Sequence, residues 1–422
     1  MSSAGGAADP DAVRAELRDW LTVNWDPALG LVEWRTRLAT SGWACPTWPV
    51  AWCGRDLPSW ATSLVVEELD RIGGVGVPDG VGMNLVAPTM LEHGSDELKE
   101  RFLRPTVTGE ISWCQLFSEP GAGSDLAGLT TSAELDGDEW RVNGQKVWNT
   151  SAHHADFGLL LARTDWDAPK HRGITCFAVP MRNPAVEVRP LRQMNGHASF
   201  NEVFFDDAPI PADHVIGAIG GGWSVALTTL AHERRLAPTR PDVSRPRAPG
   251  RAVDEATAEA AVAAEPYRWY PQRAGRPDLV VERAVAEGVD ADPVTRQALA
   301  RVVSMTRVAQ WTQQRAVAAR ALGRPPGPEG SLGKLASSDI ARAASRTHAG
   351  IAGASGMLSG ADGPLGGTIT EIFVSVPAVS IAGGTDEIQH NILGERVLGL
   401  PKEPQVDRDI PFRDVPKNTG RG

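Results

Sequence analysis

The chain has 422 residues, of which 42% are hydrophobic and 22% charged, a composition typical of globular proteins with several compact units. The net charge of −10 argues against nucleic acid or an anionic membrane as the main partner, and no apolar run reaches the roughly 18 residues of a membrane-spanning helix. The first residues lack a secretory pattern, and the four cysteines have neither metal-ligand nor disulfide spacing. We therefore expect a cytoplasmic protein without membrane insertion or bound metal.

Residues 1–110 are predicted to form a helical domain. Pro10 suits the first turn of a helix, and a second apolar periodic stretch covers residues 64–72. A third helix is expected to open near Ser95, with acidic residues in its first turn, and to end at Pro105.

Residues 111–217 have the texture of a small all-β domain. Asp136-Gly137 and Asn143-Gly144 are typical hairpin turns. The short strand-like runs that follow are residues 158–163, 174–179, 186–188 and 203–205.

Residues 218–402 are predicted to form a C-terminal helical domain. The stretch 236–290 is rich in Pro and Arg, and we interpret it as an irregular insertion packed on the helical domain, with a disordered linker as the alternative. The polar residues 403–422 are expected to be a mobile tail. The helices expected after the insertion cover residues 293–320, 333–350 and 386–398.

The motif with the clearest chemistry is Gln115–Asp125, which contains a Gly-Ala-Gly turn. Such a turn exposes backbone N–H groups, and Ser124 and Asp125 add a hydroxyl and a carboxylate, so the loop can approach a polar ring or a phosphate. Taken alone, the motif is better explained by an ordinary β-turn.

A second motif, Gly144–Ser151, follows closely. It places Trp148 and Thr150 two residues apart on a strand, and therefore on the same side. A Trp in this setting either belongs to the core or frames a flat heteroaromatic ring.

Together with Phe205–Pro211 and Gly383–Gln389, these motifs resemble the acyl-CoA dehydrogenase family in order and spacing, from about residue 10 to 401. The resemblance implies an α+β multidomain fold: an N-terminal helical domain, a middle β-barrel or sandwich, and a C-terminal four-helix bundle. It implies FAD-dependent oxidation of an acyl-CoA thioester to the 2,3-enoyl form, with electrons passed to an electron-transfer flavoprotein in lipid metabolism.

The resemblance also implies roles for the matched positions. FAD is expected to contact Gln115, Phe117, Ser118, Trp148 and Thr150, with Trp148 against the flavin and Thr150 near its N5 atom. Further expected contacts are Ser124 with the pantetheine or phosphate of the substrate, and Thr385 and Glu387 with the FAD of the assembled complex.

The pattern breaks at the proton-abstracting glutamate, because the usual position before Gly-Thr is Gly383. Either the chain is a non-catalytic subunit, or the base lies elsewhere. Isovaleryl-CoA dehydrogenase-like members place it before an Arg on the first long C-terminal helix, which here matches Glu233 and Arg234. Glu233 is therefore the candidate base, and Arg234 and the backbone at Gly383 are expected to face the substrate. A solvated Glu-Arg pair on a helix remains the alternative.

The segments by which family members reach the FAD of a neighbouring subunit are poorly matched. One is not recognisable, and the other is reduced to Gly350–Gly356. A homo-oligomer (dimer or tetramer) and an α2β2 heteromer both remain possible. The sequence also leaves open the acyl group, a carrier-protein thioester in place of CoA, and oxidase or monooxygenase chemistry.

Overall fold

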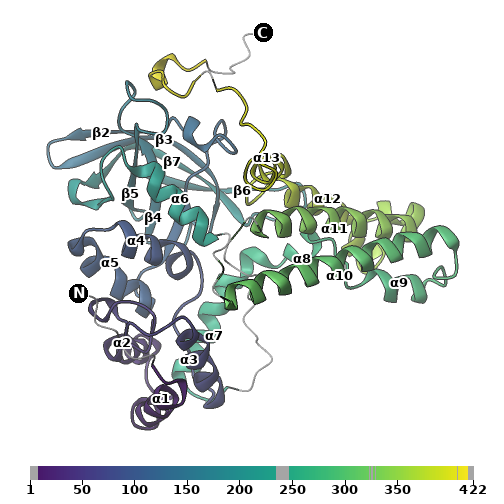
Figure 1. The fold of residues 1–422 in the computed structure, drawn as a ribbon, viewed down its shortest axis with the longest axis horizontal. Coiled ribbons are helices and arrows are strands. Elements are labelled where there is room, and N and C mark those ends of the chain that lie inside the picture. The colour runs from purple at the N-terminus through teal and green to yellow at the C-terminus, as the bar shows by residue number, and fades with distance from the viewer. Residues whose placement is uncertain are drawn as a thin grey trace. The chain divides into compact units, whose positions relative to one another are not determined.

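The computed structural model describes residues 8–233, 247–322, 324, 327, 329–405 and 407–416. The chain forms two compact units. The first comprises Met1–Leu191, Phe200–Pro266 and Asp407–Gly422, and the second comprises Arg192–Ser199 and Tyr267–Val406. The predicted order of helical, β and helical parts is confirmed (Figure 1).

The N-terminal helices of the first unit pack around buried Leu, Val and Trp side chains. Helix α5 does not end at Pro105, as the sequence predicted, but continues to Thr108. Thr106 and Val107 are buried, and this packing offsets the lost N–H of the proline. Gly109, at φ 82°, then ends the helix. The helices are α1 (Pro10–Asn24), α2 (Leu31–Ser41), α3 (Trp60–Arg71), α4 (Ala87–His93) and α5 (Asp96–Thr108).

The β part is one eight-stranded sheet with the order β6-β7-β3-β2-β4-β5-β8, to which β1 adds by pairing with β4. Alternate residues of β4 lie in two separate cores: Leu159 and Leu161 share one with α4, α5 and α6, and Leu160 lies in the other. The strands are β1 (Trp113–Leu116), β2 (Ser132–Asp136), β3 (Glu139–Thr150), β4 (Phe157–Arg163), β5 (Ile174–Pro180), β6 (Val186–Leu191), β7 (Phe200–Pro211) and β8 (Val215–Ile216).

Of the two predicted hairpin turns, only Asp136-Gly137 is confirmed, since it joins β2 to β3. Asn143-Gly144 lies inside β3, where the register with β7 shifts by one residue. The strand continues because β7 pairs along its length, and Gly144, at φ 151°, forms a bulge against Thr131.

Two helices within residues 218–402, which were predicted to form the C-terminal domain, belong to the first unit instead. Helix α6 (Gly222–Glu233) packs against β5 and α4 in the first unit. The prediction of an irregular segment over 236–290 is wrong for part of its described residues, because α7 (Arg251–Ala264) is a regular helix. Its Ala- and Glu-rich sequence favours a helix, and Ala252 and Val253 enter the core of the N-terminal helices rather than the C-terminal ones.

Part of the C-terminal tail, which was expected to be mobile over residues 403–422, packs against the first unit. Residues 407–416 pack on the β part of the first unit, and Phe412 is only 3% exposed. Its backbone N–H donates to the carbonyl of Ala168 at 3.0 Å. The buried aromatic side chain gives this segment an anchor that charge alone does not provide.

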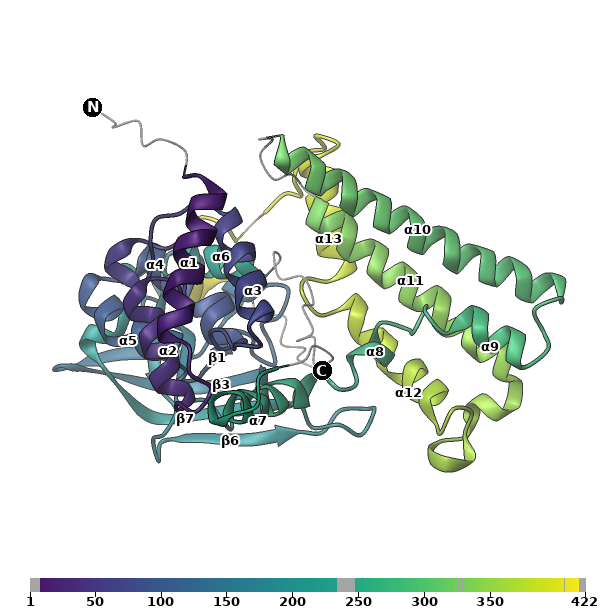
Figure 2. The same ribbon diagram turned by 90° about the horizontal axis from the view of Figure 1, so that it is seen from below.

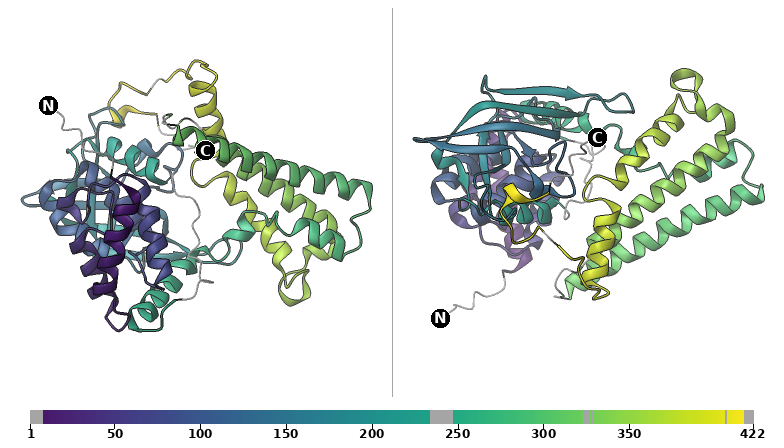
Figure 3. Two further views of the ribbon diagram at one scale, coloured as in Figure 1. Left: turned by 60° about the horizontal axis from the view of Figure 1, so that its bottom comes forward. Right: turned by 90° about the horizontal axis from the view of Figure 1, so that it is seen from above.

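The second unit is helical, and α10 and α11 form an antiparallel hairpin (Figures 2 and 3). The loop 192–199 belongs to this unit, where His197 pairs with Glu371 at 2.9 Å and Trp269 Nε1 donates to Ser199 Oγ at 3.1 Å. The helices are α8 (Tyr270–Arg273), α9 (Val280–Ala286), α10 (Pro293–Ala321), α11 (Glu329–Ala352), α12 (Thr368–Ser375) and α13 (Asp386–Arg396).

Two negative findings concern the part of the chain that the structure describes. None of its helices has the length and apolar character needed to cross a bilayer. No three of its His, Cys, Asp and Glu side chains are grouped as metal ligands would be.

Candidate functional site

A buried ion pair holds the start of the Gly-rich loop. Glu119 is 7% exposed, and its carboxylate accepts hydrogen bonds from Lys146 Nζ at 2.8 Å and from the backbone N–H groups of Thr130 and Thr131 at 2.7 and 2.8 Å. Lys146 Nζ also donates to the carbonyl of Phe117 at 3.0 Å. The loop is thereby fixed to β3.

Burial alone would raise the pKa of Glu119, but the charge of Lys146 and the hydrogen bonds around the carboxylate lower it to about 2. Glu119 is therefore ionised at neutral pH. Our sequence analysis missed this pair, although a signal was present: Glu119 and Lys146 are oppositely charged residues next to apolar strand segments.

The second motif forms a strained bulge. Opposite β7, the register of β3 shifts between Lys146 and Asn149, and Trp148 adopts a left-handed backbone with φ 65°. Its indole is 56% exposed and contacts the ring of Phe200 edge-on at 5.7 Å. A bulky side chain in this conformation costs about 1–3 kcal/mol and is typical of ligand sites.

Backbone and amide hydrogen bonds bring the predicted residues of both motifs together. Val147 N–H donates to the carbonyl of Ser118 at 2.9 Å, and Asn149 Nδ2 donates to the carbonyl of Gln115 at 2.7 Å. Asn149 Oδ1 is buried and has no partner among the described residues, so it can still accept a hydrogen bond. Asn149, which the sequence analysis missed, therefore connects β3, which carries Trp148 and Thr150, to β1, which carries Gln115 and leads to Ser118.

Phe117 was predicted to line the flavin, but its ring is 4% exposed and lies in the core shared by the sheet and the helices. The backbone is the part of this residue that remains for a ligand. The alternation of sides along β1 and the residue after it explains this placement.

The glycines of the loop have open space beside them. A Cβ atom added to Gly121 or Gly123 would meet nothing within 4 Å, and neither residue has a positive φ. Neither packing within the chain nor backbone conformation therefore requires glycine at these positions. Glycine here leaves the backbone open to close approach by a ligand, and Ser124 is exposed beside them.

A second turn with matched residues precedes α13 in the second unit. Gly383 and Gly384 have φ values of 69° and 86°, and Gln389 Nε2 donates to their carbonyls at 3.3 and 3.4 Å. Thr385 caps α13 by accepting from Ile388 N–H. Glu387 is exposed, and its pKa is lowered by hydrogen bonds at this helix terminus.

Asp386, which the sequence analysis did not select, fixes this turn to α11. Its buried carboxylate accepts from Ser338 Oγ at 2.7 Å, Lys334 Nζ at 2.8 Å and Arg342 Nη1 at 2.7 Å. Burial opposes ionisation, but these donors hold the pKa of Asp386 well below its usual range. The only signal in the sequence was an acidic residue in the first turn of a helix.

The candidate base Glu233 is the last residue of α6 in the first unit and is half-buried. Arg234 lies outside the described residues. Gly383, in the second unit, has no carboxylate to offer, as the sequence already required.

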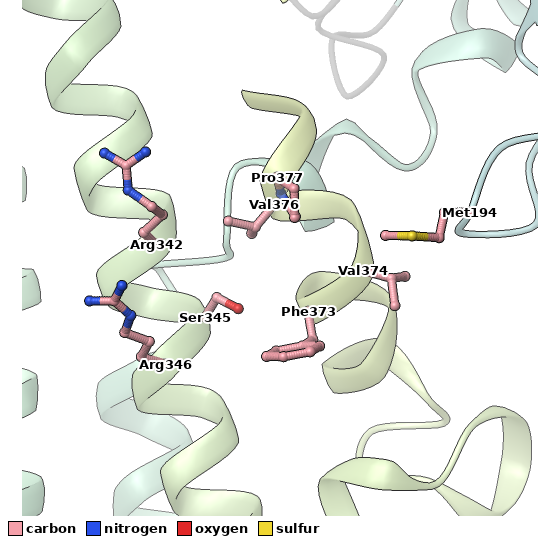
Figure 4. Close-up of a pocket in the computed structure, with 8 residues that line it drawn as sticks. All are labelled: Met194, Arg342, Ser345, Arg346, Phe373, Val374, Val376 and Pro377. Atoms are coloured by element: carbon pink, nitrogen blue, oxygen red, sulfur yellow. The ribbon is translucent and has the colours of Figure 1, made fainter. Parts of the chain in front are cut away.

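A surface cavity of about 250 Å³ lies in the second unit (Figure 4). Phe373 and Val374 of α12 line it on one side and Arg342 and Arg346 of α11 on the other. It includes none of the predicted site residues.

Comparison with known proteins identifies the family. Family models for the N-terminal, middle and C-terminal domains of acyl-CoA dehydrogenases match residues 11–110, 114–208 and 281–398. Acyl-CoA dehydrogenase IpdE1 of Mycobacterium tuberculosis is 33% identical over 418 residues, covering 94% of this chain and 99% of that protein. The chain belongs to the acyl-CoA dehydrogenase family.

One further relative of this acyl-CoA dehydrogenase is much longer than this chain, and one similar solved structure is described as a complex. FadE34 of Mycobacterium tuberculosis is 36% identical over 86% of this chain, which spans 46% of that protein's length. A solved structure described as the Tcur3481-Tcur3483 steroid ACAD has a TM-score of 0.64 and 26% identity over 94% of this chain and all of that one. The ChsE4-ChsE5 complex from Mycobacterium tuberculosis has a TM-score of 0.63 and 25% identity over 95% and 100%.

The family implies FAD, and the residues present fit it. The exposed, strained Trp148 offers an aromatic face, Asn149 Oδ1 offers an unused acceptor, and the space beside Gly121 and Gly123 is open. These features lie in one unit of the chain and suit a flat ring with a polar edge.

Proposed function

We propose that this acyl-CoA dehydrogenase oxidises an acyl-CoA thioester to the 2,3-enoyl thioester, with Glu233 removing the α-proton. The observation that carries the proposal is the strained, exposed Trp148, whose neighbours Val147 and Asn149 donate hydrogen bonds to Ser118 and Gln115 of the first motif. FAD, when bound, supplies the acceptor for the hydride that leaves the β-carbon.

The chain's own residues bind and orient the two partners. Gln115, Ser118 and Thr150 offer polar groups beside Trp148, and the exposed N–H groups and hydroxyl of the Gly121–Ser124 turn suit the phosphate or pantetheine of CoA. Thr385 and Glu387 are proposed to contact FAD once the oligomer has formed.

The α-proton of a thioester is weakly acidic, so its removal requires a hydrogen bond to the thioester carbonyl as negative charge develops there. We assign that bond to a backbone N–H at Gly383. The left-handed turn is held in place by Gln389, so its N–H groups need little reorganisation. Without a side chain, Gly383 cannot act as the base, and the carboxylate must come from elsewhere.

Glu233 is the base in this proposal because it matches the alternative family position on the first long helix after the β part. Glu233→Gln should retain FAD but lower the rate of flavin bleaching by substrate at least about 10²- to 10⁴-fold, the usual contribution of a general base. Glu100→Gln, the same change at an exposed position of α5, should bleach normally. Normal bleaching by Glu233→Gln would refute the assignment. It would favour the alternative that the chain is a non-catalytic subunit, which the missing carboxylate at Gly383 supports.

We propose a bulky, polycyclic acyl group as the substrate. One similar structure is described as a steroid ACAD, and glycine at position 383 frees volume that suits a bulky acyl group. The test is anaerobic bleaching with steroid-type and linear acyl-CoAs, and with the matching carrier-protein thioesters. Faster bleaching with linear acyl-CoAs would contradict the proposed substrate class.

We further propose an α2β2 assembly with a partner of the same fold. Gly350 stands where family members have a Gln that reaches a neighbour's FAD, and it is exposed at the end of α11. The similar ChsE4-ChsE5 structure is a complex of two different chains. Light scattering and FAD content provide the test: one FAD per two chains supports the heteromer, whereas a homo-oligomer with one FAD per chain overturns it.

The electron acceptor is proposed to be an electron-transfer flavoprotein. A dehydrogenase should reduce this acceptor much faster than it reduces oxygen. Rapid reoxidation of the reduced enzyme by air would instead indicate an oxidase.

A further inference from the structure

The C-terminal residues Asp407–Pro416, here called the strap, pack against the β part of the first unit. They follow Leu398, which is the last residue matched by the family's C-terminal domain. Pro411 bridges to Pro169, and the backbone N–H of Arg413 donates to the carbonyl of Trp166 at 3.0 Å. The strap is seen as the yellow segment beside the sheet in Figure 3. Its contacts lie on the segment between β4 and β5.

Through Phe412, the strap covers a buried arginine that holds the end of the Gly-rich loop. The guanidinium of Arg163 is fully buried and lies 3.3 Å from the centroid of the Phe412 ring. Its nitrogens donate to the carbonyls of Ala127 and Leu129 at 2.7 and 3.1 Å. No carboxylate contacts this guanidinium among the described residues, so the ring face of Phe412 is its stabilising partner on the strap side.

Through Asp407, the strap reaches the loop itself. Lys170 Nζ donates to Asp407 Oδ2 at 2.6 Å and to Asp125 Oδ1 at 3.1 Å. The ammonium therefore bridges one carboxylate on the strap and one on the loop, directly after Ser124. Burial lowers the pKa of Lys170, but the two carboxylates more than offset this effect and raise it, so the bridge is charged at neutral pH.

We infer that the strap positions the Gly121–Asp125 turn for ligand binding, through Lys170 and Arg163. The turn is fixed at its start by Glu119 and Lys146, and Lys170 and Arg163 add contacts at and after its other end. Glycine-rich segments lose much entropy on ordering, so a turn that is already ordered binds a ligand more tightly. The consequence for the substrate rests on the proposed function, in which this turn contacts CoA.

Asp407→Asn tests the inference without disturbing the core, because Asp407 is a partly exposed surface residue. Hydrogen exchange of residues 119–130 should accelerate in the FAD-loaded protein. KM for acyl-CoA should rise about five- to tenfold, the effect of one ordinary hydrogen bond, with little change in kcat or FAD content. Asp409→Asn, the same change at an exposed strap residue, should match wild type, and Asp407→Glu should restore KM.

The outcomes separate the positioning role of the strap from the proposed contact between the turn and CoA. Unchanged exchange of residues 119–130 in both Asp407→Asn and Phe412→Ala would overturn the positioning role of the strap, whatever the kinetics. Faster exchange with an unchanged KM would support the positioning role and instead refute the proposed contact between this turn and CoA. A general loss of folding in Phe412→Ala would leave Asp407→Asn as the deciding variant.

Discussion

Trp148 and Gly383 have nearly the same left-handed backbone, with φ values of 65° and 69°, yet one carries the largest side chain and the other has none. Each lies in a segment fixed by a buried carboxylate, Glu119 beside the first and Asp386 beside the second. The conformation is costly for Trp and free for Gly.

The difference indicates what each segment offers. A strained Trp is retained where the side chain itself makes the contact, whereas glycine suffices where only backbone N–H groups are used. In both segments the acidic motif residue points inward and holds the backbone, so neither Glu119 nor Asp386 is available as a base. In the proposed mechanism the proton-abstracting carboxylate therefore comes from a third segment, which is why Glu233 matters.

The largest expected effect comes from breaking the ion pair beside Trp148. Glu119→Gln leaves the charge of Lys146 buried without its partner, and should lower the free energy of unfolding by about 3–5 kcal/mol. Urea denaturation measures the loss. Glu187→Gln, which breaks an exposed pair with Arg189, should leave the midpoint nearly unchanged. Equal midpoints for the two variants would show that the buried pair is not needed to hold the loop.

The lowered pKa of Glu119 also predicts that the folded protein loses stability in acid. The pKa of Glu119 is about 2 in the folded protein against an ordinary 4.5, so its contribution is complete above pH 4.5 and is lost as the pH falls toward 2. Wild type should therefore lose stability on acidification more steeply than Glu119→Gln, and their difference should shrink below pH 4.5. Parallel stability curves across this range would contradict the assignment.

Asp386→Asn should have a smaller effect in the other segment. The donors Lys334 and Arg342 are partly exposed, so water can replace the lost carboxylate, and the expected loss is about 2 kcal/mol. Calorimetric unfolding measures it, with Asp339→Asn as a control at the exposed partner of Arg342. An unfolding temperature equal to that of the control would mean that Asp386 does not hold the turn.

The sequence was sufficient to predict the order of helical, β and helical parts, because local motifs carry it, whereas the roles of the site residues in both segments stay predictions. It did not predict that Asn143-Gly144 lies within β3, since pairing with β7 outweighs a local turn preference. Nor did it predict the continuation of α5 past Pro105, which depends on burial.

The supporting contacts were harder to predict because they join distant positions. Lys170 and Asp407 are 237 residues apart, and Lys334 and Asp386 are 52 apart. No periodicity or motif links such pairs. A charged residue in a polar segment is ordinarily solvated, so only the fold shows that Asp407 pairs with Lys170 and Asp386 with Lys334.

The smallest effects test the contrast between Trp148 and Gly383 directly. Trp148→Gly should make the FAD-free protein about 1 kcal/mol more stable than Trp148→Ala, because both variants lose the indole and only alanine keeps the strain. Gly383→Ala should cost a similar amount, whereas Gly350→Ala, a helical position with a negative φ and open space, should gain up to about 1 kcal/mol. Thermal unfolding of the four variants measures these differences.

FAD affinity then separates strain that serves binding from strain that does not. Both Trp148 variants should bind FAD about tenfold more weakly, the loss expected for one aromatic contact, even though the glycine variant is the more stable protein. Gly383→Ala should leave FAD affinity unchanged, since a backbone N–H is still present there. If Trp148→Gly bound FAD as tightly as wild type, the strained conformation would have no role in the flavin site, and the contrast between the two segments would reduce to packing alone.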